Sequence, residues 1–70
     1  MKGLELFCNR IKELRKDKKL SARELADKLS VSDSTIIRWE NGTMVPTIDK
    51  LYEIAKFFGV TADYLLGLED

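Results

Sequence analysis

Signals that start and stop helices recur at short intervals along the chain, and they constrain its fold more than any other feature. Hydroxyl residues that can cap a helix precede runs whose apolar residues are spaced by three and four, and Gly follows several of these runs. The pattern predicts five short helices with tight connections, over roughly residues 4–18, 22–29, 33–41, 48–58 and 62–66. Asn41-Gly42 could also mark a hairpin, but its flanks lack the alternation that strands require. The expected fold class is therefore all-α.

The second and third predicted helices form a pair with a characteristic connection. Ser21 followed by Glu24 makes a capping box for the second helix, and Ser32 caps the third. About three residues separate the two helices, which is the signature of a helix-turn-helix. Both helices are shorter than an isolated helix can sustain in water, so packing against the rest of the chain must hold them.

Composition limits the chemistry that the chain can carry out. The sequence has 70 residues, which indicates one domain over residues 1–70, and it contains no His and one Cys. These counts exclude His-based catalytic triads, the usual zinc sites and an internal disulfide. Because the sequence also lacks a phosphate-binding loop, we expect no enzyme, no metal and no cofactor. The lone Cys8 fits a packing role and a reducing, cytoplasmic location, and no apolar run is long enough to cross a membrane.

Charge is zero overall but unevenly distributed along the chain. Residues 1–38 hold ten Lys or Arg and six Asp or Glu, whereas residues 39–70 hold two Lys and six acidic residues. One interpretation is a face that meets a polyanion and another that avoids it. The alternative is an ordinary solvated helix surface, and charge alone leaves both open.

The third predicted helix has two faces of different character. At about 100° per residue, Ile36 and Trp39 point inward together. Small polar, cationic and aliphatic side chains occupy the opposite side, namely Ser34, Ile37, Arg38 and Asn41. Such a mixture suits readout of base edges in the major groove of DNA, although a polar solvent face would show the same pattern. Asp33, at the N-terminal end, either caps the helix or accepts a hydrogen bond from a cytosine amino group.

Ordered blocks of residues along most of the chain resemble a known family. They are Arg10–Arg15, Leu20–Ala26, Val31–Gly42, Pro46, Leu51, Ala55, Phe58–Val60 and Asp63–Gly67. In this order they resemble the Cro/phage-repressor (XRE-type) helix-turn-helix family over about residues 4–68. The resemblance implies a compact five-helix, lambda-repressor-like DNA-binding domain whose third helix lies in the major groove. It also implies homodimers that bind palindromic operators in double-stranded DNA.

The family's contact positions fall on particular residues of this sequence. The resemblance implies base reading by Asp33, Ser34 and Arg38, to which the helical wheel adds Ile37. It implies phosphate contacts at both ends of the motif, from Arg15, Ser21, the amide of Ala22, Asn41 and the backbone near Thr43. Arg23 is an extra cation near the second helix, and it reaches either a phosphate or the carboxylate of Asp27.

The resemblance also implies structural roles. Arg15 matches a position that pairs with Glu40, whose carboxylate lies near the buried side of the third helix and would be unfavourable there without a partner. Lys19 and Ser30 stand where Gly often ends the first two helices, so each is expected to hold a left-handed backbone conformation.

Apolar spacing predicts the core and a surface for a second copy. Trp39 is assigned to the core rather than to a stacking platform for bases. The rest of the expected core is Phe7, Ile11, Leu14, Leu25, Ala26, Leu29, Val31, Ile36, Ile48, Leu51, Ile54, Ala55, Phe58, Val60, Leu65 and Leu66. Phe57 lies away from the apolar stripe of its helix and is expected to be exposed, either as a lone aromatic or as part of a partner surface. With Met44, Val45, Val60 and Tyr64 it forms a possible dimer surface.

We therefore expect a sequence-specific, double-stranded DNA-binding transcriptional regulator of prokaryotic or phage origin, repression being the commoner role in the family it resembles. The alternative is an antitoxin or another protein-interaction module on the same fold. For that alternative, the Phe57 region and the acidic Glu69 and Asp70 are the candidate surfaces.

Overall fold

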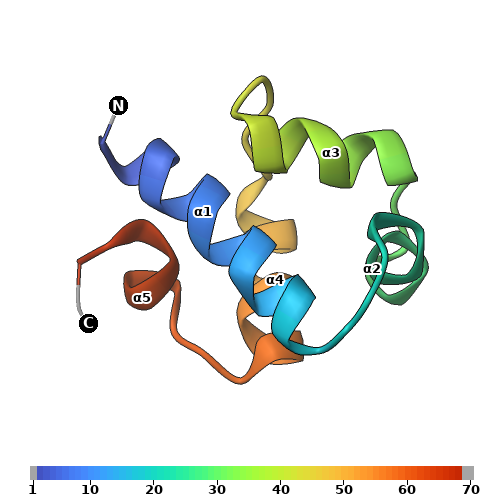
Figure 1. Ribbon diagram of the computed structural model, residues 1–70. Coiled ribbons are helices and arrows are strands. Elements are labelled where there is room, and N and C mark those ends of the chain that lie inside the picture. Colours follow the sequence, from blue (N-terminus) through green and yellow to red (C-terminus); the bar gives the residue numbers. More distant parts are fainter. Residues whose placement is uncertain (1, 69–70) are drawn as a thin grey trace.

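The computed structural model describes residues 2–68 and contains an all-α arrangement of five helices in that range (Figure 1). They are α1 (Lys2–Asp17), α2 (Ala22–Leu29), α3 (Asp33–Asn41), α4 (Ile48–Phe58) and α5 (Ala62–Leu66). The predicted all-α fold with a helix-turn-helix at its second and third helices is confirmed. Bounds agree for α2 to α5, whereas α1 begins two residues earlier and ends one residue earlier than predicted.

Hydroxyl side chains begin the helices from α2 to α5. Each cap residue has an extended backbone, and its hydroxyl oxygen accepts the backbone N–H of the third residue that follows. The four caps are Ser21, Ser32, Thr47 and Thr61. These local bonds explain why the starts of the four helices could be predicted from the sequence alone.

Left-handed residues end the helices, including two that are not Gly. Lys19 has φ 59° and Ser30 has φ 58°, as predicted. After α1, the Lys19 N–H donates to the carbonyl of Lys16, and the Leu20 N–H donates to the carbonyl of Arg15. This pair of bonds satisfies carbonyls at the helix end that would otherwise lack a partner. Because a Cβ is unfavourable in this conformation, both positions hold strained backbone.

The core lies where α1 meets the helix-turn-helix on one side and α5 on the other. In Figure 1, α1 crosses in front of α4, with α2 and α3 to its right and α5 to its left. Buried apolar side chains from all these helices form one cluster, made of Phe7, Ile11, Leu25, Ala26, Leu29, Ile36, Trp39, Ile54, Ala55 and Leu65. The Trp39 indole is 2% exposed, so its predicted core position is confirmed.

The covered side of α4 differs from the predicted one. Ile48 was expected in the core, yet it is 85% exposed, and Tyr52 on the same edge of the helix is 63% exposed. Instead, α4 is buried along the edge that carries Ile54, which is fully inaccessible. The Lys50 ammonium reaches across to the carbonyl of Leu29 (2.8 Å) and ties α4 to the end of α2.

Phe57 also departs from expectation. It is half-buried and packs against the core, with its ring edge-on to the ring of Phe58 at 5.0 Å between centroids. The ammonium of Lys18, just after α1, lies over the Phe57 ring at 5.6 Å from its centre. The prediction of an exposed Phe57 was therefore wrong, because a helical wheel of α4 carries no information about side chains from other segments, such as Lys18, that lie against it.

Candidate nucleic-acid interface

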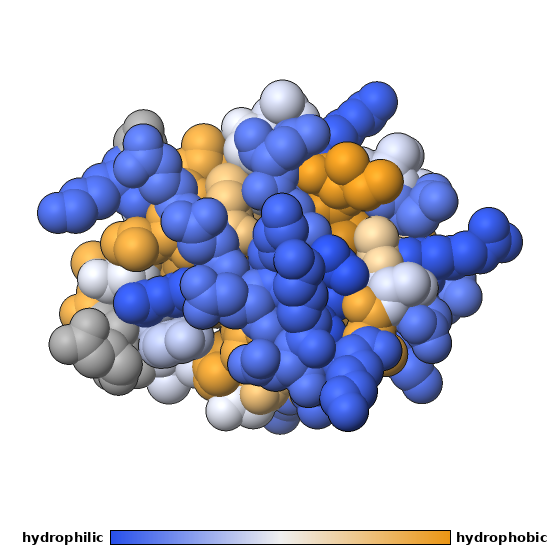
Figure 2. Space-filling view, viewed as in Figure 1, coloured by the Kyte–Doolittle hydropathy of each residue, from blue (hydrophilic) through white to orange (hydrophobic). Residues whose placement is uncertain are grey.

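The helix α3 separates a buried side from an exposed side. Ile36 is fully buried and Trp39 nearly so, whereas Ile37 is 52% exposed. Ser34 and Arg38 are exposed on the same outer side. In Figure 2, an apolar group flanked by hydrophilic residues lies over α3. The outer side thus offers one cation, one hydroxyl and one aliphatic group on a helix that is anchored from behind.

The N-terminal end of α3 carries a local network of hydrogen bonds. The Ser32 hydroxyl accepts the Thr35 N–H at 3.2 Å, and its oxygen also lies 3.1 Å from the Ser34 hydroxyl. The Asp33 carboxylate accepts the Ser34 N–H at 2.9 Å. Asp33 therefore stabilises the first turn of α3, where a negative charge also complements the helix dipole. Its second oxygen makes no hydrogen bond within residues 2–68, so the base-reading alternative stays a prediction.

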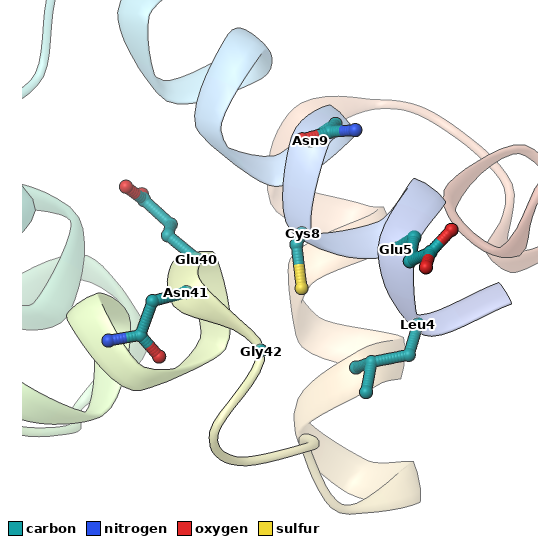
Figure 3. A pocket seen from close by; sticks show the side chains of 7 residues that line it. All are labelled: Leu4, Glu5, Cys8, Asn9, Glu40, Asn41 and Gly42. Atoms are coloured by element: carbon teal, nitrogen blue, oxygen red, sulfur yellow. The ribbon is translucent and has the colours of Figure 1, made fainter. Parts of the chain in front are cut away.

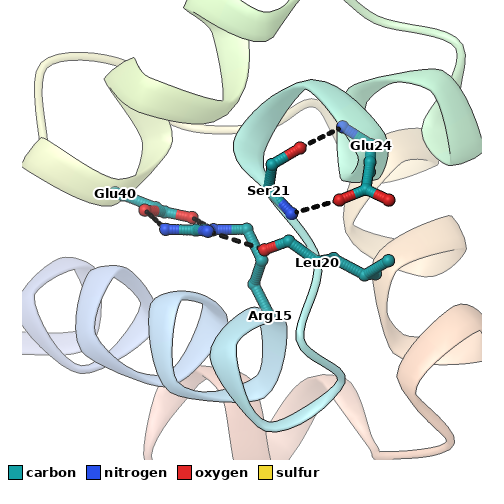
Figure 4. Close-up of polar contacts among 5 residues, drawn as sticks. All are labelled: Arg15, Leu20, Ser21, Glu24 and Glu40. Atoms are coloured by element: carbon teal, nitrogen blue, oxygen red, sulfur yellow. Dashed lines mark hydrogen bonds and ion pairs between the residues drawn. The ribbon is translucent and has the colours of Figure 1, made fainter.

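The N-terminal end of α2 is a capping box (Figure 4). The Ser21 hydroxyl accepts the Glu24 N–H at 3.0 Å, and the Glu24 carboxylate accepts the Ser21 N–H at 2.9 Å. The bond from the Ser21 backbone holds the pKa of the Glu24 carboxyl below its ordinary value. The donors at this end that the capping box leaves available to an anion are the Ser21 O–H, the N–H of Ala22 and the exposed side chain of Arg23. Across the described residues Arg23 forms no ion pair with Asp27.

The C-terminal end of α3 is closed by hydrogen bonds within the chain. The N–H groups of Gly42, Thr43 and Met44 all donate to the carbonyl of Arg38. The Asn41 side-chain oxygen accepts both the N–H of Thr43 (3.1 Å) and its hydroxyl (2.7 Å). These backbone donors are used within the chain, so the side-chain amide nitrogen of Asn41 is the donor this end offers to a phosphate.

An ion pair joins α1 to α3, as the resemblance implied (Figure 4). The Arg15 Nε lies 2.7 Å from one Glu40 oxygen, and Nη2 lies 3.0 Å from the other. Its Nη1 donates to the carbonyl of Leu20 at 2.8 Å, a contact that the sequence did not predict. The hydrogen bonds that Arg15 donates to the Glu40 carboxylate raise the pKa of Arg15 above its already high ordinary value. Since the two side chains are only 14% and 10% exposed, Arg15 acts chiefly to position both helices of the motif.

An open pocket of about 500 Å³ lies beside this ion pair, between α1 and the end of α3 (Figure 3). Its lining is Leu4, Glu5, Cys8, Asn9, Glu40, Asn41 and Gly42. Burial raises the pKa of the Cys8 thiol, which keeps the thiol protonated and unreactive. With two carboxylates and no cation in the lining, the pocket is unsuited to a phosphate.

The predicted dimer residues do not share one exposed surface. Met44, Phe57, Val60 and Tyr64 are half-buried, and Val45 is 56% exposed. Val45 lines a small hollow between α1 and α4, whereas Val60 lines another on the outer side of α4. The Tyr64 ring is covered by the Arg10 guanidinium, 4.3 Å from its centre, and Arg10 also donates to the Tyr64 carbonyl.

Sequence comparison identifies the family. Residues 11–65, which include the helix-turn-helix and most of the packed core, match the family described as Helix-turn-helix. The chain belongs to the Cro/phage-repressor (XRE-type) helix-turn-helix family. This family comprises transcriptional regulators rather than enzymes, as predicted.

Several named regulators are similar to this XRE-type chain. YobD of Bacillus subtilis, an uncharacterized HTH-type transcriptional regulator, is 37% identical over 65 residues, which cover 93% of this chain and 58% of YobD. The HTH-type transcriptional activator BcrR of Enterococcus faecalis is 41% identical over 91% of this chain and 31% of BcrR. The cryptic phage CTXphi transcriptional repressor RstR of Vibrio cholerae is 33% identical over 79% of this chain and 50% of RstR.

This XRE-type chain therefore spans between 31% and 58% of the length of these three relatives. No solved structure gives a significant match to it. Within residues 2–68, no helix is long and apolar enough to cross a membrane, and no group of three or more potential metal ligands lies together.

Proposed function

We propose that this chain binds double-stranded DNA in a sequence-specific manner and regulates transcription by placing α3 in the major groove. The observation that carries the proposal is the exposed strip of Ser34, Ile37 and Arg38 on a helix held from behind by Ile36 and Trp39. A helix presented in this way can enter a groove without losing its packing.

The chemistry of the strip fits base edges. The Arg38 guanidinium can donate two hydrogen bonds to O6 and N7 of one guanine, which is the commonest specific contact in the major groove. Ile37 offers an aliphatic surface to a thymine methyl group, and Ser34 can donate to or accept from several bases. Asp33, with one oxygen on the first turn of α3, has the other for a cytosine amino group.

Phosphate contacts would fix the register of the helix on the duplex. At one end, the Ser21 hydroxyl, the Ala22 N–H and the Arg23 side chain provide donors at the positive end of α2. At the other end, the side-chain amide nitrogen of Asn41 is the donor, and the bonds that its oxygen accepts from Thr43 hold it in place. Arg15 holds the two helices at a fixed angle through Glu40 and Leu20, so both ends can meet the backbone together.

Two copies on a palindromic operator complete the proposal. A homodimer with twofold symmetry matches two half-sites about one turn of DNA apart. We propose repression as the direct outcome, because a bound dimer occludes a promoter without any further contact. The names of the similar regulators include both roles: RstR is named as a repressor and BcrR as an activator.

Selection of bound duplexes from a random pool, at two salt concentrations, tests this proposal. The expected product is a palindromic site, and Arg38→Ala should lower the preference for one base in each half-site by roughly tenfold to a hundredfold. Arg23→Ala is the matched control, because loss of a phosphate contact weakens all sequences alike and lowers the salt slope by about one. Enrichment of no sequence, or an Arg38→Ala profile identical to that of the unmodified chain, would contradict sequence-specific reading.

The antitoxin alternative has lost its support from surface residues. Phe57, which was predicted to anchor a partner, is half-buried. Glu69 and Asp70 lie outside the described residues. No other observation favours a protein-interaction module over a DNA-binding domain.

A further inference from the structure

The Asn41-Gly42 pair at the end of α3 combines the groups that a spontaneous modification of the chain needs. Gly42 has no side chain to shield its backbone nitrogen, so this nitrogen can attack the side-chain amide carbon of the preceding Asn. Asn41 is exposed, and both residues line the open pocket of about 500 Å³ beside α1, so water reaches them (Figure 3). A nucleophile, an electrophile and solvent therefore meet at this turn.

The fold holds the Asn41 side chain in an orientation that favours the attack. Its oxygen, Oδ1, accepts the Thr43 N–H at 3.1 Å and the Thr43 hydroxyl at 2.7 Å. Because these bonds reach past Gly42 to the next residue, the amide carbon Cγ is held on the side of the Gly42 nitrogen. Two donors on one oxygen also stabilise the negative charge that develops there during the attack.

One hydrogen bond opposes the attack. The Gly42 N–H donates to the carbonyl of Arg38, so its nitrogen is available only when the last turn of α3 opens. A backbone hydrogen bond of this kind changes an equilibrium by roughly twofold to tenfold. Helix ends also open far more readily than the core of a domain. The bond therefore slows the reaction without preventing it.

We propose that Asn41 is a deamidation site and that its deamidation weakens DNA binding. The Gly42 nitrogen forms a bond to Cγ of Asn41 while the Cγ–Nδ2 bond breaks, and ammonia leaves with the proton of the Gly42 nitrogen. The product is a cyclic imide, a succinimide. Water then opens one of its two C–N bonds and yields either aspartate or isoaspartate. The only co-reactant is water, and nothing is oxidised or reduced.

Deamidation removes the donor that this end of α3 offers to a phosphate. The donor is Nδ2 of Asn41, since the Asn41 oxygen is occupied by Thr43. A carboxylate in place of the amide repels a phosphate, and isoaspartate also lengthens the backbone of the turn by a methylene group. The effect on DNA binding rests on the proposed function, in which Asn41 contacts the DNA backbone, whereas the reaction itself does not.

Incubation of the full chain at mildly alkaline pH tests the site, with peptide mass spectrometry that separates Asn, aspartate and isoaspartate. Asn9 is the internal control, because it is exposed but lies inside α1 and precedes Arg10, whose side chain shields the backbone nitrogen. Asn41 should convert in the folded chain while Asn9 persists, and unfolding in urea should accelerate conversion of Asn41 by roughly twofold to tenfold. Conversion of Asn41 no faster than that of Asn9 in the folded chain would overturn the proposal.

Thr43→Val distinguishes activation by the fold from the reactivity of any Asn-Gly pair. The change removes the hydroxyl bond to Oδ1 but keeps the branched side chain and the backbone N–H. It should slow conversion of Asn41 several-fold in the folded chain and leave the rate in urea unchanged. Equal or faster conversion in the folded chain would overturn the activating role of Thr43.

Fluorescence anisotropy with the palindromic duplex obtained by selection tests the effect on DNA binding. Asn41→Asp should weaken binding by about tenfold or more, because a charge-assisted bond to phosphate is replaced by repulsion. Asn9→Asp is the matched control, since it adds the same charge on α1 and should have little effect. Thermal melts verify that both variants are folded, because a carboxylate at the C-terminal end of α3 opposes the helix dipole. Equal binding by the two variants would overturn the effect on DNA.

Ageing of the protein gives a measurement that does not depend on how well Asn41→Asp folds. As aspartate and isoaspartate accumulate at position 41, the unmodified chain should lose duplex binding in proportion. Asn41→Gln should keep the binding it starts with, because the longer side chain forms the corresponding ring far more slowly. Equal losses in both aged chains would overturn the effect on DNA. If Asn41 deamidates but neither the fresh chain nor any variant binds DNA, the deamidation site stands and the proposed function fails.

Discussion

Replacement of Glu40 by Gln is the most informative single change for the fold of the motif. Gln has nearly the same shape as Glu, but it removes the negative charge and places an NH₂ group against one of the Arg15 donors. In the structure, Arg15 donates two charge-assisted bonds to this carboxylate, at 2.7 and 3.0 Å, and the two side chains are 14% and 10% exposed. The substitution therefore leaves a mostly buried guanidinium with only neutral acceptors, the Gln side-chain oxygen and the carbonyl of Leu20.

The expected loss follows from these two bonds. A hydrogen bond to a charged group contributes about 1.5–3 kcal/mol, and Gln preserves part of one bond, so we expect Glu40→Gln to lower the free energy of unfolding by about 2 kcal/mol. For a chain of this size, that amounts to a decrease of roughly 8–16 °C in Tm. The pKa of Arg15 is raised from an already high value, so the cation, and with it the effect, persists throughout the neutral range.

Thermal and urea unfolding followed by circular dichroism would measure this effect. Glu53→Gln is the control within the same chain, because Glu53 pairs with Lys50 at 3.2 Å but is 45% exposed. Exposed pairs of this kind contribute less than about 1 kcal/mol. Equal losses for the two variants, or an unchanged Tm for Glu40→Gln, would refute the argument that burial gives the Arg15 pair its strength.

Two further predictions concern the ends of helices. Lys19→Gly should raise the free energy of unfolding by about 0.5–1 kcal/mol, because Lys19 holds φ 59° and Gly removes the strain of its Cβ; an unchanged or lowered midpoint in urea would argue against strain there. Glu24→Gln should alter the pH dependence of stability. The pKa of Glu24 is lower in the folded chain than its ordinary value of 4.5, so its contribution is complete above that pH and lost as the pH falls through the folded value. The stability difference between Glu24→Gln and the unmodified chain should accordingly shrink in acid, and a difference that is constant down to about pH 2 would contradict this assignment.

Much of the fold could be predicted because its signals are local. The hydroxyl of Ser21 and the carboxylate of Glu24 meet within one turn, so the start of α2 depends on four consecutive residues. The left-handed backbone at Lys19 and Ser30 was instead implied by the family resemblance, because Gly often stands at these two positions. The inward direction of Ile36 and Trp39 follows from the helical period, and the Arg15–Glu40 pair came from the family resemblance.

Sequence reasoning predicted which residues form the candidate site better than it predicted the hydrogen bonds that they make. Sequence reasoning placed Ser34, Ile37 and Arg38 on one outer side, where the structure also has them. It missed the three N–H groups that converge on the Arg38 carbonyl, and therefore expected backbone donors near Thr43 that are already used. The Asn41-Gly42-Thr sequence is typical of such a turn, but which carbonyl accepts the bonds depends on how the loop closes.

By itself, the sequence determined where α2 to α5 begin and end and which residues lie on the apolar side of each helix, because these properties depend on neighbours within about four positions. Tertiary structure decided which part of each apolar side is covered. On α4, Ile48 lies in the apolar stripe and Phe57 lies away from it, yet Phe57 packs against the core while Ile48 remains in water. The covering groups come from distant parts of the chain, and helical periodicity carries no information about their positions.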